Sequence, residues 1–191
     1  MKNIFKIVAL LFSVISFAQI ADKAENVSPL LIGEKIPNVV LHDANGKEVK
    51  TKDIFDKKTV VVVYRGGWCP YCNSQLADMQ EIEKDIIALG YQVVAISPDA
   101  PSFLKQTLDK KELQYQLYSD SEGVFSQAVG IAFVREKPKL DKYSEGKNPG
   151  FLPVPTVYVL NDKQEIEFMY INPNYGTRLK GDVLLAVLKT L

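Results

Sequence analysis

The stretch VVVVYRGGWCPYCNSQL, Val60 to Leu76, decides how the fold of this chain is interpreted. A run of β-branched residues, a Gly-Gly turn and two cysteines, Cys69 and Cys72, follow one another directly, and these are the only cysteines in 191 residues. Pro70 comes next to the first cysteine, and proline is favoured at the first position of a helix. The stretch therefore predicts a buried strand, a turn, and a helix that begins at or beside Cys69.

The start of a helix favours a thiolate. Unpaired backbone N–H groups and the positive end of the helix dipole lie there, and cysteines so placed, or in Cys-x-x-Cys pairs, have lowered pKa values. Residues three apart on a helix have Cβ atoms ~5–6 Å apart, whereas a disulfide needs ~3.5–4.5 Å. A small adjustment at the helix start closes that gap, so Cys69 and Cys72 are predicted to form a redox-active disulfide.

Three alternative roles for the pair are weaker. A zinc site takes four ligands, but the chain offers two thiols and one distant histidine, His42. Covalent haem attachment requires histidine after the second cysteine, and residue 73 is asparagine. A purely structural disulfide would close a very short loop, which gains little from cross-linking. We therefore expect thiol redox chemistry with no metal and no other cofactor.

The two sulfurs are expected to differ. Cys69, at the helix start, should be the more exposed and receive the stronger dipole assistance. Cys72 begins an apolar stripe that continues through Leu76 and Met79 at helical spacing, so it should be more buried. For a disulfide substrate we therefore expect attack by Cys69, with Cys72 resolving the mixed disulfide.

Length and composition indicate one soluble globular domain. The apolar fraction is 47% and the charged fraction 24%, and Lys plus Arg equals Asp plus Glu at 23 each. Such values are ordinary for a soluble domain. Because no net charge would attract polyanions, we expect no nucleic acid and no anionic membrane surface as partner.

The N-terminus is typical of an exported protein. MKNIFKIVALLFSVISFAQ has two lysines, an uncharged apolar run from Ile7 to Phe17, and Ala18 before a possible cleavage point. The run is shorter than the ~20 apolar residues of a membrane-spanning helix. Residues 1–18 are thus predicted to be a signal peptide, 19–31 a polar lead-in and 32–191 the folded domain. The processed protein should be periplasmic or extracellular, with no stable membrane insertion.

The rest of the chain alternates strand and helix patterns. A hairpin around DANG, Asp43 to Gly46, precedes strands at 59–64 and 91–97, with a helix from Cys69 to Gly90 between them. A helix at 100–113, a strand at 115–120, a short helix, a second hairpin around NDKQ and a final helix follow, and 134–151 is predicted to be a loop. Right-handed strand–helix–strand crossovers require a parallel sheet centre. The fold class is therefore α/β, with a mixed central sheet, helices on both faces and an N-terminal β-hairpin.

The sequence resembles the thioredoxin superfamily, and within it the alkyl hydroperoxide reductase / thiol-specific antioxidant group in its peroxiredoxin-like branch. The resemblance covers about Ile32 to the C-terminus and rests on VVYRGGWCPYC, VVAISPD, YSD and LPVPTVYVLND. It implies a thioredoxin-like fold and a thiol-dependent peroxidase with an antioxidant role. The implied partners are a hydroperoxide or a protein disulfide as substrate, and an external thiol reductant, either a thioredoxin-like protein or a membrane electron donor.

The resemblance also implies residues that position the substrate. In thioredoxin folds a cis-proline presents backbone opposite the cysteines, and Val154-Pro155-Thr156 occupies that place, so we expect a cis Val154–Pro155 bond. Trp68 resembles the tryptophan that flanks the first cysteine of thioredoxins. The simpler alternatives are a strand start for Pro155 and a core aromatic for Trp68.

Two departures from the family patterns leave the substrate open. Peroxiredoxins carry Pro-x-x-x-Thr-x-x-Cys at this turn, which places Arg65 at the proline, Cys69 at the threonine and Cys72 at the peroxidatic cysteine. This alignment implies attack on peroxide by Cys72, with Cys69 resolving and Arg65 substituting for the missing threonine. Thioredoxins have a buried acid in the preceding strand, but that position is Val63 here.

Two activities and one non-enzymatic alternative remain. A thiolate attacks either a peroxide oxygen or a disulfide sulfur, and the sequence permits both. The peroxiredoxin-like interpretation takes precedence over disulfide exchange. The third hypothesis is a binding module with a fixed disulfide, whose partner would contact the loop from Val134 to Phe151.

Overall fold

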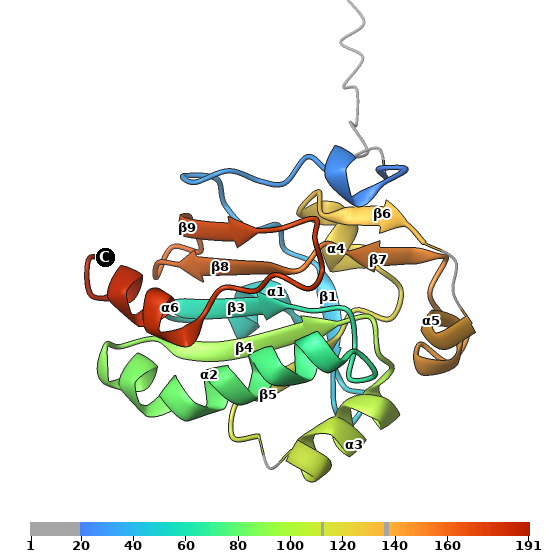
Figure 1. The fold of residues 1–191 in the computed structure, drawn as a ribbon, viewed down its shortest axis with the longest axis horizontal. Helices are drawn as coiled ribbons and strands as arrows, with labels where there is room; N and C mark the ends of the chain where they lie inside the picture. The colour runs from blue at the N-terminus through green and yellow to red at the C-terminus, as the bar shows by residue number, and fades with distance from the viewer. Residues whose placement is uncertain (1–19, 112, 136–137) are drawn as a thin grey trace, which may run out of the picture.

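A computed structural model describes residues 20–111, 113–135 and 138–191, which form a seven-stranded mixed sheet with helices on both faces (Figure 1). The strand order is β2-β1-β5-β4-β3-β8-β9, and β6 and β7 form a separate small sheet. The strands are β1 Val40–Asp43, β2 Glu48–Lys50, β3 Thr59–Val63, β4 Gln92–Ser97, β5 Gln116–Ser119, β6 Ala132–Val134, β7 Phe151–Pro153, β8 Thr156–Leu160 and β9 Ile166–Ile171. The helices are η1 Ala24–Asn26, α1 Thr51–Ile54, α2 Pro70–Ala88, α3 Pro101–Lys111, α4 Val124–Ala128, α5 Pro138–Tyr143 and α6 Gly181–Leu188.

The centre of the sheet is parallel and its flanks are antiparallel. Strand β3 pairs in parallel with β4, and β4 with β5, because helices α2 and α3 return the chain to the same end of the sheet. Strand β8 runs antiparallel to β3, and β9 antiparallel to β8. The mixed α/β sheet and the N-terminal hairpin β1–β2 confirm the predicted fold class.

Each face of the sheet has its own apolar core. On one face, the side chains of Val60, Val62 and Tyr64 pack with Cys72 under α2, and α6 lies against α2. On the other face, Val61 and Val63 pack with residues of α1 and α4. All five residues of β3 are buried, as expected for a strand covered on both sides. The chain that leaves β3 toward Cys69 therefore starts from the middle of the core.

The predicted loop at 134–151 is wrong in part. It contains α5, Pro138–Tyr143, and its two ends belong to β6 and β7, which pair antiparallel. Arg135 N donates to the carbonyl of Gly150 at 2.6 Å, which closes the base of this excursion. The Lys, Pro and Gly residues favour a loop, but short elements that tertiary pairing stabilises carry little periodicity of their own.

The described part of the N-terminal lead-in packs on the small sheet. Ala21 forms a bridge with Phe133, through Ala21 N to Ala132 O at 3.3 Å and Val134 N to Ala21 O at 2.8 Å. The predicted signal peptide, residues 1–18, and its cleavage point beside residue 19 lie outside the described residues. Within the described ranges, no helix combines the length and apolarity that a membrane span requires.

Candidate active site

The helix that carries the cysteines begins as the sequence indicates. Cys69 is the N-cap residue of α2, with extended backbone angles (φ −94°, ψ 118°), and Pro70 is the first helical residue. Asn73 N donates to the Cys69 carbonyl at 3.0 Å, the first hydrogen bond of the helix. Because Cys69 lies outside the regular helix, its side chain can turn toward Cys72 without breaking a helical turn.

The two sulfurs are thiols in this structure, and both are buried. Cys69 is 2% exposed and Cys72 is fully buried. Cys69 is thus the more exposed residue of the two, as predicted, but only by a small margin. Neither cysteine therefore presents an open surface to solvent.

One negative charge is held between the two sulfurs and belongs to Cys69. The Cys72 thiol donates a hydrogen bond to Cys69 and so lowers the pKa of Cys69 to about 5, against the opposing effect of burial. The Cys72 backbone N–H and the guanidinium groups of Arg65 and Arg178 lower that pKa further. The pKa of Cys72 is raised because its proton is held by Cys69 and because it is buried. The reduced site is therefore a thiolate–thiol pair.

Arg178 is a site residue that the sequence did not reveal. Its Nη2 lies 3.3 Å from Cys72 Sγ, and its Nη1 donates to the carbonyl of Thr177 at 3.4 Å. It comes from the segment between β9 and α6, which brings a cation to the sulfurs from the far end of the chain. No spacing relates it to the cysteines, so only the fold places it there.

Arg65, in the loop after β3, is the second cation that acts on the cysteine pair. It is 5% exposed, and its guanidinium lies 4.3 Å from the centre of the Tyr175 ring and 5.6 Å from that of Trp68. Cation–π contacts of this kind stabilise a buried guanidinium. Its Nε has no hydrogen-bond partner among the described residues. The predicted pair Arg65 and Trp68 therefore lies at the site, with Tyr175 as a further residue not foreseen.

The expectation for Pro155 is wrong in its central point: the Val154–Pro155 bond is trans. Val154 N donates to the Ile131 carbonyl at 2.9 Å, so the chain passes from β7 into β8 in an extended path that needs no cis turn. The Thr156 hydroxyl donates to the Val154 carbonyl at 2.8 Å and stabilises the start of β8. The argument for disulfide exchange that rested on a cis bond is thereby removed.

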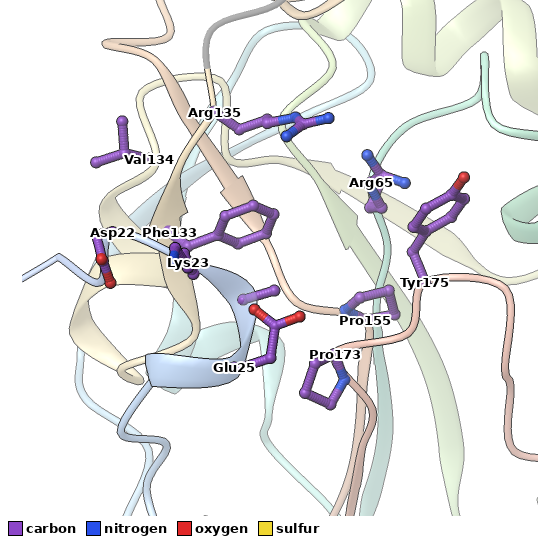
Figure 2. Close-up of a pocket in the computed structure, with 11 residues that line it drawn as sticks. Asp22, Lys23, Glu25, Arg65, Phe133, Val134, Arg135, Pro155, Pro173 and Tyr175 are labelled. Atoms are coloured by element: carbon purple, nitrogen blue, oxygen red, sulfur yellow. The ribbon is translucent and has the colours of Figure 1, made fainter.

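A pocket of about 230 Å³ opens beside Arg65 (Figure 2). Figure 2 shows Arg65 next to the Tyr175 ring, with Pro155 and Pro173 drawn below them. The pocket also takes in the N-terminal lead-in and strand β6; its lining residues there are Asp22, Lys23, Ala24, Glu25, Phe133, Val134 and Arg135. Arg65 therefore joins this pocket to the thiolate, and Pro155 lies at the site as part of its wall.

A buried carboxylate, Asp99, supports the turn between β3 and α2. It follows β4 and accepts a hydrogen bond from Gly67 N at 2.6 Å. Gly66 has φ +134°, and a side chain there would lie 2.3 Å from Trp68 Nε1 and 2.6 Å from Asp99 Oδ1. Only glycine fits, because both the backbone conformation and the space exclude a Cβ atom. The Gly-Gly turn thus lets Trp68 and Asp99 approach the backbone before Cys69.

The described residues contain no cluster of side chains that could bind a metal ion. No group of three or more His, Cys, Asp and Glu side chains there could hold an ion.

Comparison with protein families gives one match to most of the chain. A model described as the AhpC/TSA family matches residues 32–169. The bcp protein of Haemophilus influenzae is 31% identical over 105 residues, which are 55% of this chain and 68% of that protein. Peroxiredoxin bcp1 of Schizosaccharomyces pombe is 30% identical over 118 residues, 61% of this chain and 58% of the relative. These matches confirm the family resemblance drawn from the sequence motifs.

A second kind of relative also matches. The thiol-disulfide oxidoreductase ResA of Bacillus thuringiensis is 27% identical over 101 residues, 52% of this chain and 58% of its own length. The chain thus spans between 58% and 68% of these relatives.

Solved structures share the fold. Reduced Prx3 of Vibrio vulnificus in complex with H2O2 superposes with a TM-score of 0.73 at 14% identity, over 83% of this chain and 99% of that one. Peroxidoxin BcpB of Mycobacterium tuberculosis gives 0.66 at 18% identity, over 84% and 97%. At these identities the likeness establishes the fold alone.

Proposed function

Because the chain belongs to the AhpC/TSA family, we propose that it is an exported peroxidase that reduces hydroperoxides with Cys69 as the attacking thiolate and Cys72 as the resolving thiol. Membership makes it a thiol-dependent oxidoreductase. The observation that carries the finer proposal is the charge distribution of the pair. Cys69 is the sulfur whose pKa is lowered to about 5, while that of Cys72 is raised.

The assignment of roles differs from the one that the family alignment implies. That alignment places the peroxidatic cysteine at Cys72. Here Cys72 is fully buried and accepts a hydrogen bond from Arg178. Its thiol donates a hydrogen bond to Cys69, so Cys72 keeps its proton. The thiolate is the nucleophile in such reactions, so the sulfur that carries the charge should react first. Single cysteine variants separate the two assignments.

The first step is an attack by the Cys69 thiolate on one peroxide oxygen. An S–O bond forms and the O–O bond breaks, which leaves Cys69 as a sulfenic acid and an alkoxide or hydroxide that takes up a proton. The guanidinium groups of Arg65 and Arg178, which both act on the Cys69 thiolate, stabilise the negative charge that moves to the leaving oxygen. Both are already held in place, Arg178 by Cys72 and Arg65 by two aromatic rings.

The second step forms the disulfide. Cys72 loses its proton and attacks the Cys69 sulfur, an S–S bond forms, the S–O bond breaks, and the released hydroxide becomes water. Cys69 can approach because it is the N-cap residue and not part of the regular helix. Two electrons from an external dithiol then restore the pair. A thioredoxin-like protein or a membrane electron donor would supply them outside the cytoplasm, after removal of residues 1–18.

The volume of the pocket beside Arg65 supports a small substrate. The pocket beside Arg65 has a volume of about 230 Å³, and both sulfurs are buried. A hydroperoxide with a short organic group fits such a space, whereas a protein disulfide must bring the backbone segments that it joins close to the attacking sulfur. Protein-disulfide exchange stays the second candidate, because a Cys-x-x-Cys pair with a low-pKa first cysteine is suited to it and the ResA relative bears that activity in its name.

One comparison tests the proposal. Fully reduced protein is mixed with hydrogen peroxide, with cumene hydroperoxide and with insulin, and both thiol loss and substrate loss are followed. We expect one hydroperoxide consumed per Cys69–Cys72 disulfide formed, faster than with free dithiothreitol, and slow insulin reduction. Rapid insulin reduction with hydroperoxide turnover no faster than that of a free thiol would overturn it in favour of disulfide exchange. A pair inert to both substrates would favour the binding module.

A further inference from the structure

The N-terminal lead-in is tied to the small sheet at two points. Ala21 pairs with β6, through Ala21 N to Ala132 O at 3.3 Å and Val134 N to Ala21 O at 2.8 Å. Further along the chain, Leu30 N donates to the carbonyl of Val129 at 3.1 Å. The segment between these two points, which contains the short helix η1, is therefore held against the chain around β6.

Gly130 shows how closely the lead-in packs. It has φ +70°, and a Cβ atom there would lie 2.0 Å from the carbonyl oxygen of Ser28. Only glycine allows both this backbone conformation and this approach of two backbones. Within η1, Asn26 N donates to the Lys23 carbonyl at 3.1 Å, and Asn26 Nδ2 donates to Asp22 Oδ1 at 2.7 Å. The lead-in thus has a defined conformation and can form part of a binding site.

The lead-in supplies one wall of the pocket of about 230 Å³ beside Arg65. In Figure 2 the Phe133 ring points from β6 toward Arg65 and Pro155, and η1 lies alongside. Most of the wall is apolar, from η1, from β6, from the residue before β8 and from the segment after β9. Its apolar and aromatic residues are Ala24, Phe133, Val134, Pro155, Pro173 and Tyr175.

Two of these wall residues are large, apolar and exposed. Val134 is 48% exposed and Tyr175 is 49% exposed. Exposed apolar side chains gathered around a hollow are typical of a ligand site. Pockets that hold drug-sized ligands measure ~300–1,000 Å³, so this smaller space suits a compact organic group.

The charges on the pocket wall nearly balance. Lys23, Arg65 and Arg135 are positive, and Asp22 and Glu25 are negative. One of the three cations, Arg65, acts on the thiolate, which leaves two charges of each sign on the rest of the wall. An uncharged organic group is therefore the class of ligand that this wall accepts.

Arg65 links the pocket to the reacting sulfur. It lines the pocket, is 5% exposed, and its Nε has no hydrogen-bond partner among the residues that the structure describes. A buried donor without a partner costs free energy, and a peroxide oxygen is an acceptor that would relieve that cost. A hydroperoxide with its oxygens at Arg65 would place its organic group in the pocket.

The lead-in wall lies outside the part of the chain that the family model matches. The match covers residues 32–169, whereas Ala24 comes before it and Pro173 and Tyr175 come after it. The matched part thus supplies Arg65 and Pro155, and segments on both sides of it complete the pocket. The family match alone therefore does not define which substrate fits there.

We propose that the lead-in, through the small side chain of Ala24, selects hydroperoxides whose organic group is compact and uncharged. The inference rests on the proposed function for the reaction itself. The organic group occupies the pocket while the peroxide oxygens meet Cys69 and Arg65. An S–O bond forms on Cys69, the O–O bond breaks, and the leaving oxygen takes up a proton, so the organic group departs as an alcohol.

Ala24→Phe tests the proposal, because it fills the pocket from the lead-in side and leaves Arg65 and both cysteines in place. The rates at which reduced protein consumes cumene hydroperoxide and hydrogen peroxide are measured for each variant. Hydrogen peroxide has no organic group to place in the pocket. A single methylene changes selectivity in an apolar pocket by ~10-fold to 200-fold, so we expect the ratio of the cumene hydroperoxide rate to the hydrogen peroxide rate to fall at least ~10-fold.

Two further variants separate this role from a general loss of structure. Ala77→Phe makes the same substitution at an exposed position of α2 outside the pocket, and should keep both rates and their ratio. Ala24→Leu is a smaller change that should lower the ratio less, and it stands in if Ala24→Phe does not fold. A loss of structure lowers both rates together and leaves their ratio unchanged.

An unreactive ligand separates this inference from the peroxidase proposal. Cumyl alcohol, the product of cumene hydroperoxide, is titrated into each reduced protein, and its binding is followed by ligand-observed NMR. If no hydroperoxide is consumed, but the alcohol binds wild type and Ala77→Phe and not Ala24→Phe, the pocket assignment stands and the peroxidase proposal falls. If hydroperoxides are reduced and Ala24→Phe keeps the wild-type ratio, the inference is overturned and the peroxidase proposal stands. If there is neither turnover nor binding, both are overturned.

Discussion

The Nη2 atom of Arg178 lies 3.3 Å from the sulfur of Cys72, although 106 residues separate the two in the chain. Arg178 comes from the segment between β9 and α6, and α6 packs against α2, the helix that carries Cys72. The closing part of the fold thus delivers a positive charge to the helix start. Arg65 acts on the same thiolate, so two guanidinium groups stabilise its negative charge.

Removal of the Arg178 charge should raise the pKa of Cys69. A cation within a few ångströms lowers the pKa of an acidic group by ~1–3 units, and Arg178 is one of two that act on this thiolate. We expect Arg178→Ala to raise the Cys69 pKa by about one unit and to slow peroxide reduction by ~10-fold. Thiolate absorbance in the ultraviolet measures the first effect. Arg178→Lys should restore part of the lowered Cys69 pKa. Lys180→Ala removes an exposed charge two residues away and should change neither the Cys69 pKa nor the rate of peroxide reduction. Equal effects of Arg178→Ala and Lys180→Ala would contradict the role assigned to Arg178.

The reactivity of the reduced site should depend on pH through Cys69. Its folded pKa is about 5, lowered chiefly by the Cys72 thiol, so alkylation by iodoacetamide should rise through that pH and be level by neutrality. An acid with a lowered folded pKa stabilises the fold above its unfolded pKa. That contribution is lost as the pH falls through about 5. An alkylation midpoint near that of a free thiol would show that the pair does not hold the thiolate.

Gly66→Ala should distort the turn before Cys69. Gly66 has φ +134° and its Cβ would overlap Trp68 and Asp99, whereas Gly46 has φ +82° and open space around it. Gly46→Ala should therefore cost only the conformational term of ~1–2 kcal/mol in the free energy of unfolding. Gly66→Ala should cost a further ~1–3 kcal/mol from the steric overlap and shift Trp68 fluorescence. Denaturant unfolding measures the free energy of unfolding of both variants. Equal losses of that free energy would contradict the prediction, because they would mean that the turn at Gly66 adapts to a Cβ atom without cost.

Processing of the N-terminus is open to direct test. The two lysines, the apolar run and Ala18 predict that protein recovered from outside the cytoplasm begins at or near Gln19. The predicted new N-terminus is close in sequence to the pocket, since Asp22 to Glu25 line it. Edman sequencing or mass spectrometry of the N-terminal peptide decides it. An intact Met1 on soluble cytoplasmic protein would remove the proposal of export.

Local sequence patterns were enough to predict the centre of the fold. The valine run of β3, the Gly-Gly turn and Pro70 specify a strand, a turn and a helix N-cap within a few residues, and the structure has all three. Outside this stretch the patterns were weaker. Residues 134–151 lack periodicity because α5, β6 and β7 are short and depend on pairing with distant segments.

Only some of the site residues could be predicted from the sequence, for the same reason. Arg65, Trp68, Cys69 and Cys72 belong to one continuous turn, so their proximity follows from the sequence. Arg178 and Tyr175 reach the sulfurs through the return of the chain after β9, which no spacing encodes. Asp99 was not predicted because the thioredoxin pattern points to an acid in β3, at Val63, whereas this acid follows the neighbouring strand β4.

The reaction of single cysteine variants with hydroperoxide tests the central claim most directly. Reduced Cys72→Ser and Cys69→Ser proteins are each mixed with one equivalent of hydrogen peroxide in the presence of dimedone, and sulfenic acid adducts are located by mass spectrometry. We predict an adduct at Cys69 in Cys72→Ser, formed faster than on a free thiol, and none at a comparable rate in Cys69→Ser. A rapid adduct at Cys72 in Cys69→Ser, with Cys72→Ser inert, would contradict the account.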